Sequence, residues 1–166
     1  MSVSDRLVAA ADDGDVRAVA TLLAAGADPD SANREGTTPL YAAVHSGVPG
    51  VVDQLLGAGA DVNRPSHHGP PLSLVAYVPD ALVARLLAHG ANPEAVDTAG
   101  TTTLYAAAVA GEAGKVRQLL EAGADPNRIS TGPGEGTPLC AAACWGYLET
   151  VDALLSHGAD PNLPRG

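Results

Sequence analysis

The sequence has few aromatic residues and few basic ones. Aromatic residues make up 3% of the 166 residues and phenylalanine is absent, although 46% of the residues are hydrophobic. The core is therefore expected to consist of Ala, Val and Leu, whose burial contributes roughly 25 cal/mol per Å². Nine Lys and Arg residues stand against 19 Asp and Glu residues, which gives a formal net charge of −10.

This charge bears on the class of partner. A basic stripe is missing, which argues against DNA or RNA, because nucleic-acid phosphates require clustered Lys and Arg. Anionic membrane surfaces are disfavoured for the same reason. The acidic balance instead favours a partner protein with a basic surface.

Cysteines are also scarce. Cys140 and Cys144 are the only two, and their spacing of one helical turn does not favour a disulfide or indicate an oxidising compartment. The N-terminus lacks the basic and apolar segments of a secretory signal, and no run approaches the roughly 20 apolar residues of a membrane helix. We therefore expect a cytoplasmic protein. Eight Arg residues against one Lys, with abundant Ala, indicate a GC-rich bacterial genome.

One motif occurs five times, Val-x-x-Leu-Leu-x-x-Gly-Ala followed by Asp or Asn. Its Val and two Leu residues lie at i, i+3 and i+4 and so share one helix face. Its Gly stands where a helix ends in a left-handed residue. Copies spaced by 31 to 35 residues are typical of a stacked solenoid. They begin at Val19, Val52, Val83, Val116 and Val151.

A second motif precedes three of these copies by about ten residues. Its Thr is expected to cap a short helix, and Pro suits the first helical position. A Gly then links this helix to the second one, at Gly14, Gly47, Gly111 and Gly146. The copies are Thr38-Pro39-Leu40-Tyr41-Ala42-Ala43, Thr102-Thr103-Leu104-Tyr105-Ala106-Ala107 and Thr137-Pro138-Leu139-Cys140-Ala141-Ala142.

Together the two motifs resemble the ankyrin repeat, from about Ser4 to Asn162. The resemblance implies an all-α solenoid of stacked antiparallel helix pairs with projecting β-turn fingers, in a single domain 1–166. The expected repeats are approximately 4–36, 37–69, 70–100, 101–135 and 136–166. A helical bundle or another repeat type is disfavoured by the Gly stop and the Asp-Pro or Asn-Pro after it. The resemblance also implies a module that binds another protein.

Two repeats depart from the pattern. In the third, Pro79 stands where we align the linking Gly, and the finger His67-His68-Gly69 is one residue short. Either neutral drift in the loops or a change in stack curvature that shapes the groove would explain these two deletions. Before the fifth repeat, the longer finger Ser130–Gly136 is expected to be a mobile loop. Such a loop could close over a ligand or be a tolerated insertion.

The last repeat lacks the polar outer face that terminal repeats normally carry. We expect its helices to expose side chains such as Ala141, Ala142, Val151 and Leu155. Removed sequence, a covering partner or second copy, and tolerated exposure are the three explanations.

In the ankyrin family, partners contact the fingers and the two residues before the linking Gly. Trp145 is the only Trp, and Trp is enriched in interface hot spots; alternatively, it packs under its own finger. Tyr77 carries the same argument more weakly. Aligned on the linking residue, the concave positions are Asp12, Asp13, His45, Ser46, Tyr77, Val78, Val109, Ala110, Cys144 and Trp145, and the finger tips are Arg34, Glu35, His67, His68, Thr98, Ala99, Gly134 and Glu135.

Other chemistry-bearing residues have structural interpretations. Tyr41, Tyr105 and Cys140 stand where the family usually has a His that joins neighbouring repeats. His89 and His157 precede the Gly stops, a placement that suits helix C-terminal caps. No zinc motif, catalytic triad, paired carboxylates or phosphate loop is present, so we predict no catalytic, metal or cofactor site.

The leading hypothesis is a non-enzymatic module that binds a partner protein through the concave face and fingers. One alternative is a regulatory subunit that inhibits or stabilises a specific enzyme. Another is a structural protein that self-associates through its uncapped C-terminal repeat; a monomer or weak self-association is expected. Enzymatic activity is the last hypothesis.

Overall fold

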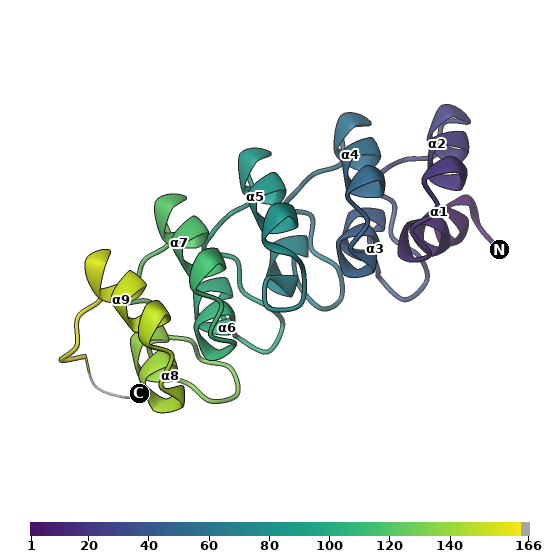
Figure 1. The fold of residues 1–166 in the computed structure, drawn as a ribbon. Coiled ribbons are helices and arrows are strands. Elements are labelled where there is room, and N and C mark those ends of the chain that lie inside the picture. Colours follow the sequence, from purple (N-terminus) through teal and green to yellow (C-terminus); the bar gives the residue numbers. More distant parts are fainter. Residues whose placement is uncertain (164–166) are drawn as a thin grey trace.

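The computed structural model describes residues 1–163 and shows two rows of helices stacked side by side (Figure 1). The end of the expected fifth repeat, 164–166, lies outside the described residues. Within the described part there is no strand, and three isolated bridges close fingers. The inner row contains α1 (Val3–Asp12), α3 (Pro39–Ser46), the 3-10 helix η1 (Pro71–Leu74), α6 (Thr103–Val109) and α8 (Pro138–Trp145). The outer row contains α2 (Val16–Ala24), α4 (Pro49–Gly57), α5 (Asp80–Ala88), α7 (Ala113–Glu121) and α9 (Leu148–Ser156).

The predicted helix boundaries are confirmed by the capping contacts. The hydroxyls of Thr38, Thr102 and Thr137 accept hydrogen bonds from backbone amides three residues later, at 3.2–3.4 Å. The linking Gly residues and the Gly stops all have positive φ, between 68° and 99°, a region that disfavours other residues. The Nδ1 atoms of His89 and His157 lie 2.8–2.9 Å from carbonyl oxygens four residues earlier, consistent with their role at helix C-termini.

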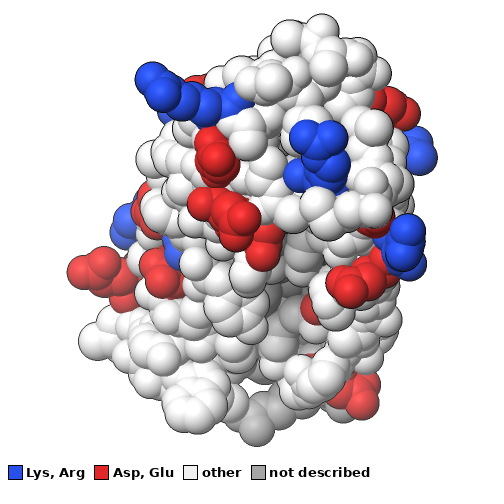
Figure 2. Space-filling model, turned by 90° about the vertical axis from the view of Figure 1, so that its right-hand side faces the viewer, with Lys and Arg blue, Asp and Glu red and all other residues white. Residues whose placement is uncertain are grey.

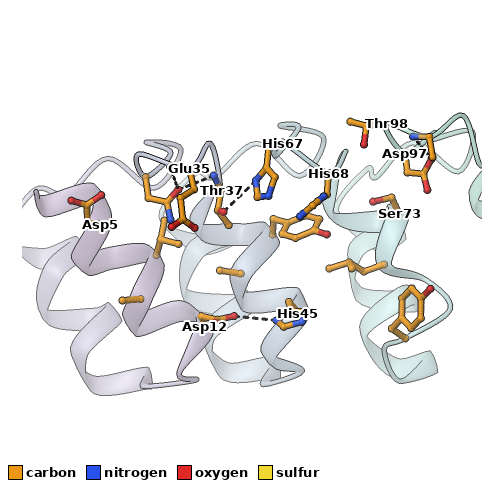
Figure 3. A pocket seen from close by; sticks show the side chains of 18 residues that line it. Asp5, Asp12, Glu35, Thr37, His45, His67, His68, Ser73, Asp97 and Thr98 are labelled. Atoms are coloured by element: carbon orange, nitrogen blue, oxygen red, sulfur yellow. Dashed lines mark hydrogen bonds and ion pairs between the residues drawn. The ribbon is translucent and has the colours of Figure 1, made fainter. Parts of the chain in front are cut away.

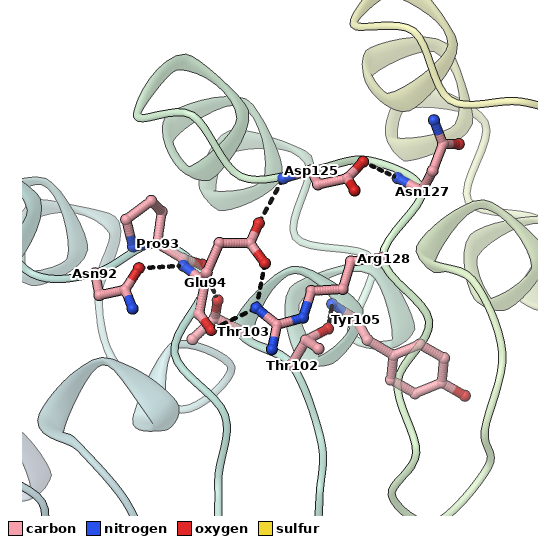
Figure 4. Close-up of polar contacts among 9 residues, drawn as sticks. All are labelled: Asn92, Pro93, Glu94, Thr102, Thr103, Tyr105, Asp125, Asn127 and Arg128. Atoms are coloured by element: carbon pink, nitrogen blue, oxygen red, sulfur yellow. Dashed lines mark hydrogen bonds and ion pairs between the residues drawn. The ribbon is translucent and has the colours of Figure 1, made fainter.

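Side chains after the Gly stops connect one repeat to the next, a feature that the sequence analysis did not identify. One side chain per turn accepts a hydrogen bond from a backbone amide of the following repeat, at 2.5–2.9 Å. The acceptors are Asp30, Asn63, Glu94 and Asn127. Glu94 also pairs with the guanidinium of Arg128, which donates to the Glu94 backbone oxygen as well (Figure 4). These contacts fix the spacing between neighbouring repeats.

The core is built from the apolar residues of the repeated motif. The first Leu of the pair is buried in all five copies, between the inner and outer rows. These residues are Leu22, Leu55, Leu86, Leu119 and Leu154. Small Ala residues such as Ala43 and Ala107 are fully buried in the inner row, which allows neighbouring helices to approach closely.

Repeat three corrects the alignment made from the sequence. Pro79 is the N-cap of α5, as Val48 is of α4 and Tyr147 is of α9, so it corresponds to the residue after the linking Gly. Val78 therefore takes the place of that Gly, and it is buried, with 5% of its surface exposed. Its expected placement on the exposed concave face was wrong. The deletion also leaves one 3-10 turn, η1, where the other repeats have an inner α-helix.

The C-terminal repeat exposes only some of the residues expected, with Leu155 among them. Ala141 and Ala142 are buried, because α8 packs against α6 on one side and α9 on another. Val151 is half-buried and Leu155 is exposed. The largest exposed apolar side chains of this repeat are Trp145 and Leu148.

The long finger before repeat five is held by hydrogen bonds. Ser130 is fully buried and forms a bridge with Gly136 across the base of the finger. The hydroxyl of Tyr105 donates to the backbone oxygen of Gly134. The expected role of Tyr105 in joining neighbouring repeats is thus confirmed, and the finger is packed onto the stack.

Lys115, the only lysine, is buried in α7 with 4% of its surface exposed. It occupies the position held by Val51 in α4 and Leu82 in α5, and its Nζ lies 3.4 Å from Glu112 Oε1. Burial of the Lys115 charge carries a desolvation cost, whereas the Glu112 side chain is 42% exposed and keeps its hydration when the lysine is removed. We expect Lys115→Val to raise the free energy of unfolding by about 1 kcal/mol, measured by urea denaturation.

Glu112→Gln is the comparison for this prediction. It leaves the buried ammonium without its carboxylate and should lower the free energy of unfolding. A loss of stability in Lys115→Val as large as that in Glu112→Gln would contradict our interpretation, because the pair would then be a net stabilising interaction.

Candidate functional site

A groove of about 910 Å³ runs along the first three repeats, between the fingers and the inner row of helices. Figure 3 shows finger residues, among them Glu35, His67 and Thr98, along one edge, with Asp12 and His45 on the helices below. Seen from the N-terminal end of the stack, acidic side chains flank a hollow in the surface (Figure 2). The groove is therefore open to solvent and can receive an extended chain.

Charge in the groove has one sign. Four carboxylates line it, from Asp5, Asp12, Glu35 and Asp97, and no Lys or Arg lines it in the described part of the chain. Three histidines, His45, His67 and His68, add hydrogen-bonding groups. Such a lining attracts cationic groups and repels anionic ones.

The inner helices position the first pair of groove side chains. Asp12 ends α1 and His45 lies in the last turn of α3, so the packing of α1 against α3 brings them together. His45 Nδ1 lies 3.1 Å from Asp12 Oδ1. Both side chains remain more than half exposed and can contact a partner.

The fingers position the second set. In the first finger, Asn33 Oδ1 accepts hydrogen bonds from the amides of Glu35 and Thr37, at 3.0 and 2.9 Å. In the third finger, Asp97 Oδ1 makes the same two contacts with the amides of Ala99 and Thr101, at 2.9 and 2.8 Å. These Asx turns hold the finger tips over the groove.

Neighbouring fingers are joined by backbone hydrogen bonds. The amide of His67 donates to the oxygen of Gly36 at 3.1 Å, and the amide of Thr98 donates to the oxygen of His68 at 3.4 Å. The rings of His67 and His68 lie 3.7 Å apart between centroids, and the His68 ring lies 6.1 Å from that of Tyr41. The middle of the groove is thus lined by rings.

Asp5 marks the N-terminal end of the groove. Its carboxylate accepts a hydrogen bond from the amide of Ser2 at 2.9 Å and lies 3.5 Å from Arg34 Nε. Hydrogen bonds from Ser2, and more weakly the Arg34 contacts, hold the pKa of Asp5 below its ordinary value.

We expect acid to weaken this end of the molecule. Because the folded-state pKa is depressed, the stabilisation from Asp5 is present above the unfolded-state pKa, about 3.9, and is lost as pH falls through the folded-state value. An NMR titration of the Asp5 carboxyl carbon should give a midpoint below about 3.9. A midpoint at or above that value would contradict the contacts described.

The structure brings together eight of the eighteen predicted concave and finger-tip residues. Those that line the groove are Asp12, Glu35, His45, His67, His68, Tyr77, Thr98 and Ala99. Tyr77 is 84% exposed, as expected for a contact residue. Asp13, Arg34 and Ser46 lie outside the lining, and Val78 is buried.

Trp145 and Cys144 lie at the other end of the stack, on α8, and do not line the groove. Trp145 is 67% exposed, so it does not pack under its own finger. Its exposure agrees with the expected solvent-facing position. Trp145 and the groove nevertheless belong to two separate surfaces, whereas one continuous surface was expected.

Several groove residues were missed. Asp97 forms a finger turn in the same way as Asn33, and Tyr41 was assigned only a structural role. Ser73 and Leu74 enter the lining because η1 replaces an inner α-helix. The Asp97-x-x-Gly100 spacing, parallel to Asn33-x-x-Gly36, was a signal in the sequence that could have identified the first of these.

No group of three or more His, Cys, Asp or Glu side chains within 1–163 is arranged to hold a metal ion. Among the helices of that same part, none combines the length and apolar character needed to cross a membrane.

The chain is similar in sequence to several mammalian proteins. The chain is 36% identical over 137 residues to human "Ankyrin repeat and SOCS box protein 6", covering 74% of this chain and 32% of that protein. It is 36% identical over 96 residues to mouse "B-cell lymphoma 3 protein homolog", covering 56% and 21%. Mouse "RelA-associated inhibitor" is 42% identical over 66 residues, covering 39% and 8%.

The chain thus spans about a third or less of the length of these relatives. They are mammalian, and the bacterial origin suggested by composition stays a prediction. A family model of ankyrin repeats in three copies matches residues 72–165, and a second model of ankyrin repeats in many copies matches 7–56. These matches, the stacked helix pairs and the projecting fingers show that the chain belongs to the ankyrin repeat family.

Proposed function

We propose that this chain is a non-enzymatic binding module that holds a partner protein with a basic surface in the groove of its first three repeats. The observation that carries the proposal is the lining, which has four carboxylates and neither Lys nor Arg in the described chain. Ankyrin repeats act in protein–protein interaction, and complementary charge raises the rate of such association. The acidic net charge of −10 acts in the same direction.

The partner can be identified by photo-crosslinking. Benzoylphenylalanine placed at Tyr77, which lines the groove, is compared with the same residue placed at Ala84 on the exposed side of α5. After irradiation in native lysate, we expect one dominant adduct from position 77 and none of the same mass from position 84. Equal adducts from both positions, or adducts from position 84 alone, would show that the groove is not the binding face.

A regulatory role is the second candidate. It is supported by the 42% identity over 66 residues to a protein named as an inhibitor. If the crosslinked partner is an enzyme, adding the purified chain should change its turnover or its thermal inactivation rate. If neither rate changes, the regulatory role is contradicted and the chain acts as a passive scaffold.

Self-association is a third candidate, supported by the exposure of Trp145, Leu148 and Leu155 in the last repeat. Sedimentation equilibrium at high micromolar concentration tests it. The candidate requires a mass above that of the monomer, and Trp145→Ala with Leu148→Ala should restore the monomer mass. A monomer mass at every concentration would contradict self-association.

A cytoplasmic location is part of the proposal. Its support is compositional, since only two cysteines occur and they lie in one short helix. Fluorescence microscopy of a tagged chain in its native cell would test it, and a signal in any other compartment would contradict it.

A further inference from the structure

Repeat three has two shortened elements at the groove. Its inner element is the 3-10 turn η1 between α3 and α6, and its finger is one residue short. We call this place the repeat-three notch. It is defined by groove residues from repeats two and three, namely Tyr41, His68, Ser73, Tyr77 and Asp97.

Two tyrosines at the same motif position differ in a way that points to the notch. Tyr105 is 6% exposed, and its hydroxyl donates to Gly134 of the next finger. Tyr41 meets the short finger instead, so it is only half-buried, and its ring lies beside His68. Among residues 1–163 its hydroxyl makes no hydrogen bond. The short finger therefore leaves a tyrosine edge and hydroxyl facing the groove.

Asp97 supplies the charge of the notch. Asp97, Tyr41 and Tyr77 all line the same groove. Burial raises the pKa of Tyr41, and the Asp97 carboxylate and Tyr77 raise it further. Asp97 Oδ1 makes both hydrogen bonds of the finger turn, and the second oxygen is not used in that turn. Asn33 makes the same turn without a charge. The charge of Asp97 is therefore not required for the finger.

A planar cation fits this combination of groups better than any other side chain. Arginine offers parallel donors that match a carboxylate, and its flat guanidinium stacks on aromatic rings. Tyr77 is largely exposed and presents such a ring at the side of the notch. Lysine has neither the planar fork nor the stacking surface.

We propose that the partner inserts an arginine side chain into the repeat-three notch, from an extended segment that lies along the groove. The guanidinium pairs with the Asp97 carboxylate and stacks on Tyr77, while the Tyr41 hydroxyl acts as an additional acceptor. This inference rests on the proposed function, since it names the group by which a basic partner is recognised.

The probe is a set of three hexapeptides, acetyl-(Ala-Arg)3-amide and its lysine and citrulline counterparts, titrated into the full chain and followed by NMR. Citrulline keeps the shape of arginine and removes its charge. We expect the arginine peptide to shift the signals of Tyr41, His68 and Tyr77 most. We expect the lysine peptide to bind at least about threefold more weakly, and the citrulline peptide not at all, because both charge and stacking contribute.

Matched variants locate the contact. Asp97→Asn keeps an oxygen that can accept the hydrogen bonds of the turn, as Asn33 does in its own finger. It should lower the affinity for the arginine peptide about fivefold, a change typical of one partly exposed ion pair with an aromatic contact. Tyr77→Leu should also lower this affinity. Asp152→Asn removes one charge from the exposed side of α9 and should leave affinity unchanged.

Three results would overturn the inference: equal affinity of the arginine and lysine peptides, shifts spread over the whole acidic surface, or equal weakening by Asp97→Asn and Asp152→Asn. Crosslinking of a partner from Tyr77 would still support the groove as a binding face in that case. If no partner is crosslinked from position 77 although the arginine peptide binds, the proposed function is contradicted instead. The two experiments can therefore fail separately.

Discussion

Reversing two groove charges, Asp12→Lys with Glu35→Lys, should lower the affinity for the crosslinked partner about a hundredfold. The reason is that like-charge contacts across an interface cost several kcal/mol. Both side chains line the groove and are exposed, so their replacement should leave the fold intact. Most of the effect should appear in the association rate at low salt, where steering is strongest. Surface plasmon resonance at two salt concentrations measures it.

A second double variant provides the control. Glu121→Lys with Asp152→Lys changes the net charge by the same amount at exposed positions of α7 and α9, outside the groove. We expect it to lower the association rate only slightly. Similar losses in the two double variants would mean that overall charge, and not the groove, governs binding.

Truncating the centre of the stack, Leu119→Ala, should lower the free energy of unfolding by about 2–5 kcal/mol, the range for a buried leucine that leaves a cavity. Leu119 is fully buried in α7, which packs against both α5 and α9. Stability in a solenoid depends on contacts between neighbouring repeats, so the loss affects three repeats at once. Differential scanning calorimetry should show a melting temperature lower by about 5–15 °C.

Leu148→Ala is the matched control, because Leu148 is an exposed residue of the neighbouring helix α9. Surface substitutions of this kind usually change stability by less than about 0.5 kcal/mol. If Leu119→Ala destabilised the protein no more than Leu148→Ala, the core described above would be wrong.

Local features of the sequence were sufficient to predict the helices and their boundaries. The Thr caps and the Gly stops act within a few residues of their own position, so their signal does not depend on the rest of the fold. The periodic Leu residues likewise identified the buried face, since helical periodicity alone sets which side chains share a face.

Where the prediction failed, the outcome depended on neighbouring repeats. Aligning Pro79 with the linking Gly was reasonable from spacing, but a one-residue deletion can fall on either side of that position. Only the packing of α5 shows that Pro79 is the N-cap and that Val78 is buried. Ala141 and Ala142 were expected to be exposed because α8 belongs to the last repeat, yet their side chains pack inward.

The candidate site was predicted in part for the same reason. Finger tips and helix ends were found by counting from Gly residues, which places Glu35, His45 and Tyr77 correctly. Counting cannot show that the short finger of repeat three uncovers Tyr41 or that Asp97 faces it, because these contacts join residues about 56 positions apart in the chain. Trp145 was wrongly assigned to the same surface as the groove residues, because equivalent positions in successive repeats do not show how far apart they lie along the stack.

Hydrogen–deuterium exchange on the complex with the crosslinked partner is the most direct test of the groove as the binding face. We expect slowed exchange at amides of the first three fingers, α3 and η1, with little change in the outer helices α2, α4 and α5. Slowed exchange confined to the outer helices, or to α8 and α9 around Trp145, would contradict it.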